Sequence, residues 1–72
     1  MAIHLRAARV NAGLSQTEAA KALNISRATL VSYEGYRSVP TIEMATKIAD
    51  LYGLGIDEII FFRQKVCFKQ KN

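Results

Sequence analysis

Apolar residues recur along the chain at the three- and four-residue spacing of helices, in stretches separated by glycine or proline. From Ile3 to Asn11, Leu5 and Ala8 fall on one face, and Gly13 follows as a residue suited to a left-handed helix cap. The same reasoning predicts four more helices, over about residues 16–23, 27–33 or slightly beyond, 42–52 and 56–61. The pattern therefore predicts an all-α chain of five short helices.

The second and third of these predicted helices are joined by a tight turn that carries capping residues. Ser15 and Glu18 stand as Ser-x-x-Glu, a capping box in which each side chain accepts from the other residue's amide. Asn24, which tolerates left-handed backbone angles, lies where the chain must reverse, and Ser26 can cap the helix that follows. Ala20 is small enough for a second helix to cross closely. We expect two helices packed against each other across this turn.

Length and composition indicate one small domain. Seventy-two residues, half of them apolar, suffice for a single packed core and leave little room for a substrate cavity. A lone cysteine, Cys67, cannot form an internal disulfide, no apolar run approaches the roughly 20 residues of a membrane span, and the amino terminus lacks signal-peptide features. These features predict a cytoplasmic protein with a domain at 1–62 and a basic tail at 63–72.

The net charge of +4 at pH 7 has a localised origin. Residues 1–60 carry six cationic and six acidic side chains, so their charges balance. The excess comes from four residues of the tail, Arg63, Lys65, Lys69 and Lys71. A nucleic-acid-binding face on the domain therefore depends on where its own six cations lie, which are Arg6, Arg9, Lys21, Arg27, Arg37 and Lys47.

A string of residues between Leu5 and Ile60 has the order and spacing of a known family. It runs through Leu5-Arg6, Arg9, Gly13-Leu14-Ser15-Gln16, Ala20, Leu23-Asn24-Ile25-Ser26, Leu30, Glu34, Arg37, Pro40, Ile48-Ala49, Gly53-Leu54 and Ile56-Asp57-Glu58-Ile59. Without a gap, this string resembles the phage-repressor and Cro-type helix-turn-helix family, also called the XRE family. The resemblance implies a five-helix, lambda-repressor-like domain whose third helix enters the major groove of DNA. One departure is clear, because Glu34-Gly35-Tyr36 replaces the usual Glu-Asn-Gly and helix three is expected to end differently.

The resemblance assigns base reading to the third helix and phosphate binding to its surroundings. Arg27, Ala28 and Ser32 are the expected base contacts, since a guanidinium can donate to guanine O6 and N7 and a methyl group suits thymine. Phosphate contacts are expected from Gln16, Ser26, Thr29 and Arg37. The resemblance also pairs Arg9 with Glu34 as a structural ion pair that braces the third helix.

The apolar run Ile59-Ile60-Phe61-Phe62 supplies more hydrophobic surface than a short helix on one small core can hide. Members of the family usually pair through this region, so these four residues are expected at a two-fold homodimer interface that serves a palindromic site. The segment 63–69 is either a strand that adds to the dimer contact or a frayed cationic end.

These observations predict a sequence-specific DNA-binding regulator of transcription, acting as a homodimeric repressor on double-stranded DNA. The alternative is a protein-interaction module, such as an antitoxin or anti-repressor partner, that keeps the fold and binds a protein. Catalysis is not expected, because no nucleophile and base stand together in the sequence. A zinc site needs four suitable ligands, and the chain offers one histidine, His4, and one cysteine. No cofactor, membrane or small-molecule substrate is expected.

Overall fold

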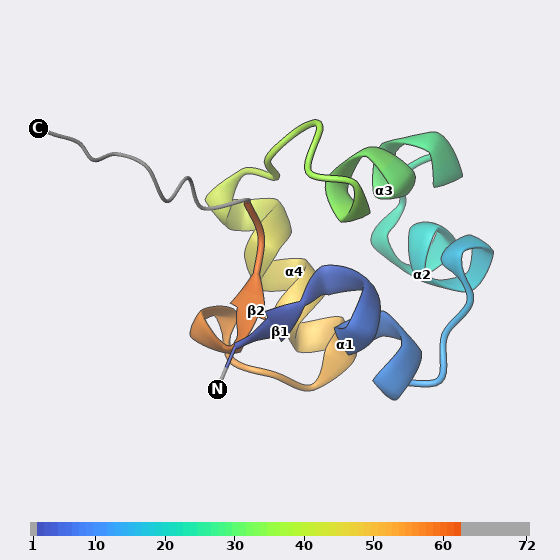
Figure 1. Cartoon of the computed structure of the whole chain (residues 1–72). Coiled ribbons are helices and arrows are strands. Elements are labelled where there is room, and N and C mark those ends of the chain that lie inside the picture. Colours follow the sequence, from blue (N-terminus) through green and yellow to red (C-terminus); the bar gives the residue numbers. More distant parts are fainter. Residues whose placement is uncertain (1, 63–72) are drawn as a thin grey trace, which may run out of the picture.

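The computed structural model describes residues 2–62, which form four α-helices and a short two-stranded ladder (Figure 1). The helices are α1 (Leu5–Asn11), α2 (Gln16–Leu23), α3 (Arg27–Glu34) and α4 (Ile42–Tyr52). A 3₁₀ turn, η1 (Ile56–Glu58), leads into β2 (Ile59–Ile60), which pairs in parallel with β1 (Ile3–His4). The described residues confirm the helical class, with four α-helices in place of the five expected. None of these helices has the length and apolar character needed to cross a membrane.

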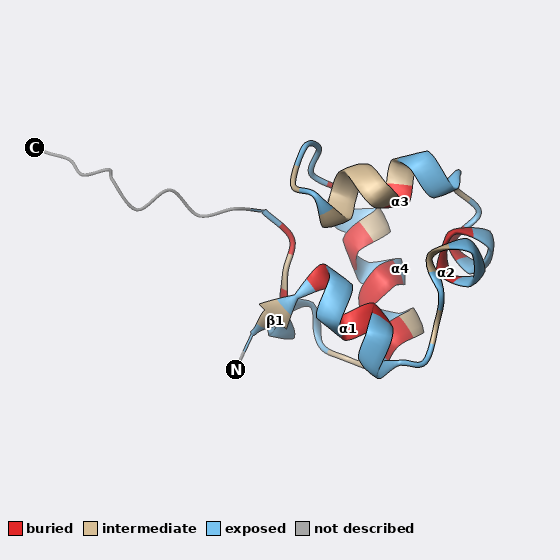
Figure 2. Ribbon diagram, turned by 45° about the vertical axis from the view of Figure 1, so that its right-hand side comes forward, coloured by how far each residue is buried: buried red, intermediate tan, exposed pale blue. Residues whose placement is uncertain are grey.

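The core is built from the inner faces of the four helices (Figure 2). Leu5, Leu30 and Ile48, from α1, α3 and α4, are fully buried. Ala19 and Ala20 are buried on α2, which packs against both α3 and α4. Small side chains at these positions allow the close helix crossing that the sequence predicts. One side of α3 therefore packs against the core, and its first turn is exposed.

The turn between α2 and α3 takes the geometry that its residues predict. The Glu18 amide donates to the Ser15 hydroxyl at 3.0 Å and the Ser15 amide donates to the Glu18 carboxylate at 2.9 Å, which closes the capping box. Asn24 ends α2 in the left-handed region, with φ 60° and ψ 42°. The Thr29 amide then donates to the Ser26 hydroxyl at the start of α3. The prediction of two capped helices around a left-handed Asn24 is confirmed.

The two ends of the domain differ from the helices expected there. The predicted fifth helix over 56–61 is wrong, and the first helix begins at Leu5, after two residues of strand. The register of the ladder is Ile3 opposite Ile59 and His4 opposite Ile60. Isoleucine favours extended backbone because its branched side chain packs well on a pleated surface. The pairing joins the two ends of the described chain, so local helical spacing did not predict it.

The run Ile59-Ile60-Phe61-Phe62 alternates between core and surface, as an extended segment does. Ile59 and Phe61 are buried in the core, Ile60 is half-buried, and Phe62 is 57% exposed. Ile59 and Phe61 are therefore the part of the run that the core hides, and the dimer interface expected of all four residues stays a prediction. Ile60 and Phe62 are the members of the run that leave apolar surface for a partner. The strand or frayed end considered for 63–69 lies outside the described residues.

Candidate nucleic-acid interface

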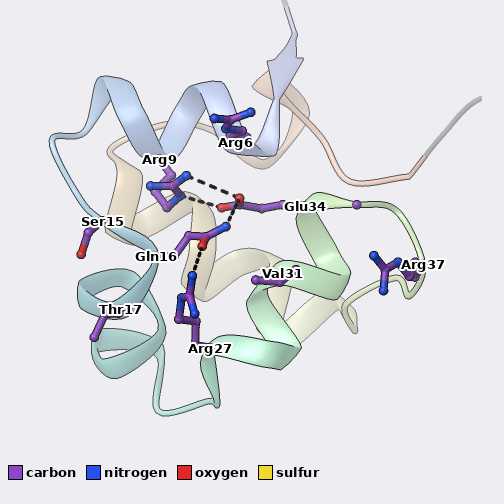
Figure 3. A pocket seen from close by; sticks show the side chains of 10 residues that line it. Arg6, Arg9, Ser15, Gln16, Thr17, Arg27, Val31, Glu34 and Arg37 are labelled. Carbon is purple, nitrogen blue, oxygen red and sulfur yellow. Dashed lines mark hydrogen bonds and ion pairs between the residues drawn. The ribbon is translucent and has the colours of Figure 1, made fainter.

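A hollow of about 570 Å³ lies between α1, the start of α2 and one face of α3 (Figure 3). Its lining comprises Arg6 and Arg9 of α1, Ser15, Gln16 and Thr17 at the start of α2, Arg27, Val31 and Glu34 of α3, and Gly35 and Arg37 after α3. The lining thus contains four of the six cationic side chains of residues 1–60 but only one of the six acidic side chains of that segment. Although the charge of the domain balances, its distribution creates a cationic face beside α3.

The carboxylate in this lining, Glu34, is paired with Arg9. Arg9 Nε lies 2.6 Å from Glu34 Oε2, and the two side chains are 9% and 6% exposed. A second guanidinium nitrogen of Arg9 donates to the Leu14 carbonyl at 2.8 Å, which ties α1 to the segment before α2. The expected structural pair is therefore in contact in the fold. Because Arg9 and Glu34 neutralise each other, the charge of the hollow comes from the other arginines.

Gln16 extends this network from the ion pair to the first turn of α3. Its Nε2 donates to Glu34 Oε1 at 3.2 Å, and its Oε1 accepts from Arg27 Nη2 at 3.2 Å (Figure 3). The amide therefore uses both its donor end and its acceptor end inside the protein. The resemblance placed Gln16 at a phosphate, and the structure adds a role that sequence spacing did not reveal. In this geometry Gln16 orients the guanidinium of Arg27.

Arg6, Arg27 and Arg37 are exposed, and none of them forms an ion pair with another residue of the described segment. They come from α1, from the first turn of α3 and from the loop after α3. Each guanidinium presents planar donors that match phosphate oxygens or the acceptor edge of guanine. Gln16 and Thr17 open α2 on the same hollow, where the positive end of a helix favours an anion. The arrangement is suited to binding a polyanion.

The other predicted contacts lie on α3 or at its N-cap, outside the hollow. Ala28 is exposed and Ser32 is half-buried, on the part of α3 that turns away from the buried Leu30. The hydroxyls of Ser26 and Thr29 are 2.8 Å apart, and both residues take part in capping α3. Of the predicted contacts, the hollow gathers Gln16, Arg27 and Arg37.

Five further residues line the hollow without having been expected at the interface, and two of them, Arg6 and Val31, lie within α1 and α3; the others are Ser15, Thr17 and Gly35. Arg6 precedes Arg9 by three residues and Val31 follows Arg27 by four, so each pair shares one face of its helix. This spacing is the feature of the sequence that could have placed Arg6 beside Arg9 and Val31 beside Arg27. Their approach to a common hollow depends on the packing of α1 against α3, which spacing within one helix does not determine.

Most other acidic side chains of the domain lie in the first turns of helices. Glu43 lies in the first turn of α4, and Asp57 and Glu58 lie in η1. The hydrogen bonds that Glu18 receives from the Ser15 amide and hydroxyl lower the pKa of its carboxyl group, because they favour the charged form. Within residues 2–62, no group of three or more His, Cys, Asp or Glu side chains is placed to hold a metal ion.

The helices around the hollow are also those that match known proteins. A sequence model of the helix-turn-helix family matches residues 5–59, from the start of α1 to β2. The chain belongs to the helix-turn-helix family. Over 49 residues it is 35% identical to an uncharacterised HTH-type transcriptional regulator of Methanocaldococcus jannaschii, a match that covers 68% of this chain and 74% of that relative. The resemblance seen in the sequence is confirmed.

Proposed function

We propose that this helix-turn-helix protein is a sequence-specific DNA-binding regulator of transcription that reads the major groove through α3. Membership in the family supports DNA binding and the regulation of transcription. The observation that carries the proposal is the set of three exposed arginines around α3 that form no ion pair within residues 2–62, namely Arg6, Arg27 and Arg37. A surface of this kind binds the phosphate backbone and places a guanidinium at base edges.

The contacts divide into base reading and positioning. Arg27, oriented by Gln16, donates to guanine, and the exposed methyl of Ala28 suits thymine. Ser32, one helical turn beyond Ala28, completes the base-reading set. Arg37 and Arg6 bind phosphates on the two sides of the hollow. Three residues at the starts of α2 and α3 supply further phosphate contacts: Gln16, Ser26 and Thr29.

Selection of bound duplexes from a random pool tests this function, since it reports binding, sequence and symmetry together. Arg27→Ala should lose roughly 1 to 3 kcal/mol on the selected site and much less on random DNA. Arg37→Ala should weaken binding to all sequences and flatten the salt dependence by about one unit. Lys47, an exposed cation of α4 outside the hollow, provides the matched control, and Lys47→Ala should bind as wild type does. A chain that enriches no duplex would favour the protein-interaction alternative.

We further propose that two copies of the chain pair through an apolar groove on β2, η1 and the start of α4. The resulting homodimer binds a palindromic operator. The groove has a volume of about 520 Å³, and all four residues of the run Ile59-Ile60-Phe61-Phe62 line it. Four of the five large apolar side chains exposed in residues 2–62 also line it: Val39, Ile42, Ile56 and Phe62. Apolar surface gathered in this way is typical of an interface. A second copy of the chain is the occupant that the two-fold symmetry of an operator requires.

Repression is the regulatory outcome that we propose for such a dimer, because a protein bound across an operator blocks access to it. A reporter whose promoter contains the selected site measures the sign of regulation. Expression of the wild-type protein should lower the reporter signal, and Arg27→Ala should restore it. A rise in the signal would identify an activator.

A further inference from the structure

Tyr36, in the loop between α3 and α4, has a backbone conformation that residues other than glycine rarely adopt. Its φ is 61°, in the left-handed region, whereas the preceding Gly35 has φ −88° and ψ 2°. The strained position is therefore occupied by a tyrosine, although a glycine lies one residue away. Such strain persists where neighbouring contacts hold the residue in place.

The side chain of Tyr36 contacts the N-terminal strand. Its hydroxyl is hydrogen bonded to His4 Nδ1, and the two rings meet edge to face with centroids 5.7 Å apart. His4 belongs to β1, which is paired with β2 and so is fixed to the domain independently of α3. This contact, which we call the His4–Tyr36 clasp, connects the loop after α3 to the ladder formed by β1 and β2.

The left-handed turn at Tyr36 also determines where Arg37 lies. The Arg37 amide donates to the Ser32 carbonyl at 2.9 Å, which folds the loop back onto α3. A Cβ added to Gly35 would lie 3.8 Å from Arg37 Nε, so the Arg37 side chain passes close to the end of α3. Arg37 thereby lines the same hollow as Arg27 (Figure 3). Its position depends on the loop conformation that the clasp holds.

We propose that His4 and Tyr36 are positioning residues, and that their clasp holds Arg37 where it binds a DNA phosphate. This inference rests on the DNA-binding function proposed above. The clasp accounts for a tyrosine at a left-handed position, because glycine would relieve the strain but would lose the contact to His4. Replacing Tyr36 by glycine should therefore lower the DNA affinity without lowering the stability.

Tyr36→Gly removes the strain and the clasp together. Its melting temperature should equal or exceed that of wild type, since the left-handed backbone suits glycine. Its affinity for a mixed-sequence duplex of about 20 base pairs, long enough for two half-sites, should fall about tenfold for each charge-assisted contact that is lost. The salt dependence should flatten by about one unit, as for Arg37→Ala. His4→Ala removes the clasp but keeps tyrosine at the left-handed position, and it should show the same losses of affinity and salt dependence.

A double variant separates positioning from general damage to the fold. In an Arg37→Ala background, Tyr36→Gly should cause no further loss of affinity, because the positioned contact is already gone. Wild-type affinity in both His4→Ala and Tyr36→Gly would overturn the proposal, as would a parallel loss of stability and affinity in both. If the wild-type protein binds no duplex at all, the proposed DNA-binding function fails instead.

Discussion

The side chain of Arg9 neutralises the Glu34 carboxylate, which lines the cationic hollow beside α3. Arg9 and Glu34 are nearly buried together, so replacing either one strands the other in a poorly solvated site. Such a loss costs about 3–5 kcal/mol, much of the stability of a small domain. A failure of Glu34→Ala to bind DNA would therefore report unfolding, whereas variants of the exposed Arg27 and Arg37 test the interface itself.

Asn24 carries a prediction about the turn between α2 and α3. Because its φ is 60°, Asn24→Gly should melt close to wild type, whereas Asn24→Val should destabilise the domain by about 1–2 kcal/mol. Thermal melts followed by circular dichroism measure both. Equal melting temperatures for the glycine and valine variants would show that left-handed strain has no effect at this position.

At the scale of single residues, the sequence predicted backbone conformations within one motif but did not predict contacts between distant segments. Asn24 could be assigned a left-handed backbone because the chain has to reverse there and no glycine is present. At the end of α3 the sequence indicated a departure from the family but not that Tyr36, rather than Gly35, takes the positive φ. That choice depends on His4, which lies far away in the sequence and is brought close by folding.

The start of α2 should respond to acid through Glu18. Its pKa is lowered in the folded protein, so the stabilising contribution is present above the ordinary value of 4.5 and is lost as the pH falls through the folded value. Glu18→Gln should lower the urea midpoint at neutral pH and should converge with wild type in acid. Glu43→Gln, in the first turn of α4 but outside a capping box, is the control. The same pH dependence in both variants would indicate a general helix-end effect.

The end of α4 should respond to alkali through Tyr52. Burial, and then the charge of Glu34, raise the pKa of its hydroxyl from 10.0 to about 12. Its contribution to stability is therefore full below pH 10 and is lost as the pH rises toward 12. The hydroxyl has no hydrogen-bond partner within residues 2–62, so Tyr52→Phe should cost little at neutral pH. Urea unfolding of both proteins should show a smaller alkaline loss for Tyr52→Phe, and identical losses would contradict the assignment.

The helices that the sequence predicted best are those with strong local boundaries. The predicted bounds of α2 and α4 match the structure, and α3 ends one residue later than its shortest predicted form. Near the two ends of the described segment, Ile3 and Ile59 pair across the domain, and this non-local contact overrode the helical spacing of 56–61. A short apolar run is compatible with helix or strand, and its partner decides between them.

Across the whole molecule, one loop joins the two surfaces that the proposed function uses. Arg37 lines the cationic hollow, and Val39 and Pro40, two and three residues later, line the apolar groove. A partner seated on the groove would therefore contact the loop that carries a phosphate-binding arginine. Dimer formation and DNA binding should be linked, so each should strengthen the other by the same factor.

The quaternary prediction rests on exposed apolar side chains that can be replaced without opening the core. Phe62 and Ile42 are 57% and 78% exposed and line the groove, whereas the neighbouring Phe61 is buried and has to be kept. The double variant Phe62→Ser with Ile42→Ser should keep the wild-type melting temperature but sediment as a monomer. It should bind one half-site weakly, while the wild-type dimer spans two half-sites roughly 34 Å apart. Val10→Ser, an exposed apolar residue outside the groove, should remain dimeric. Wild-type protein that sediments as a monomer, both free and on its selected operator, would refute the dimer.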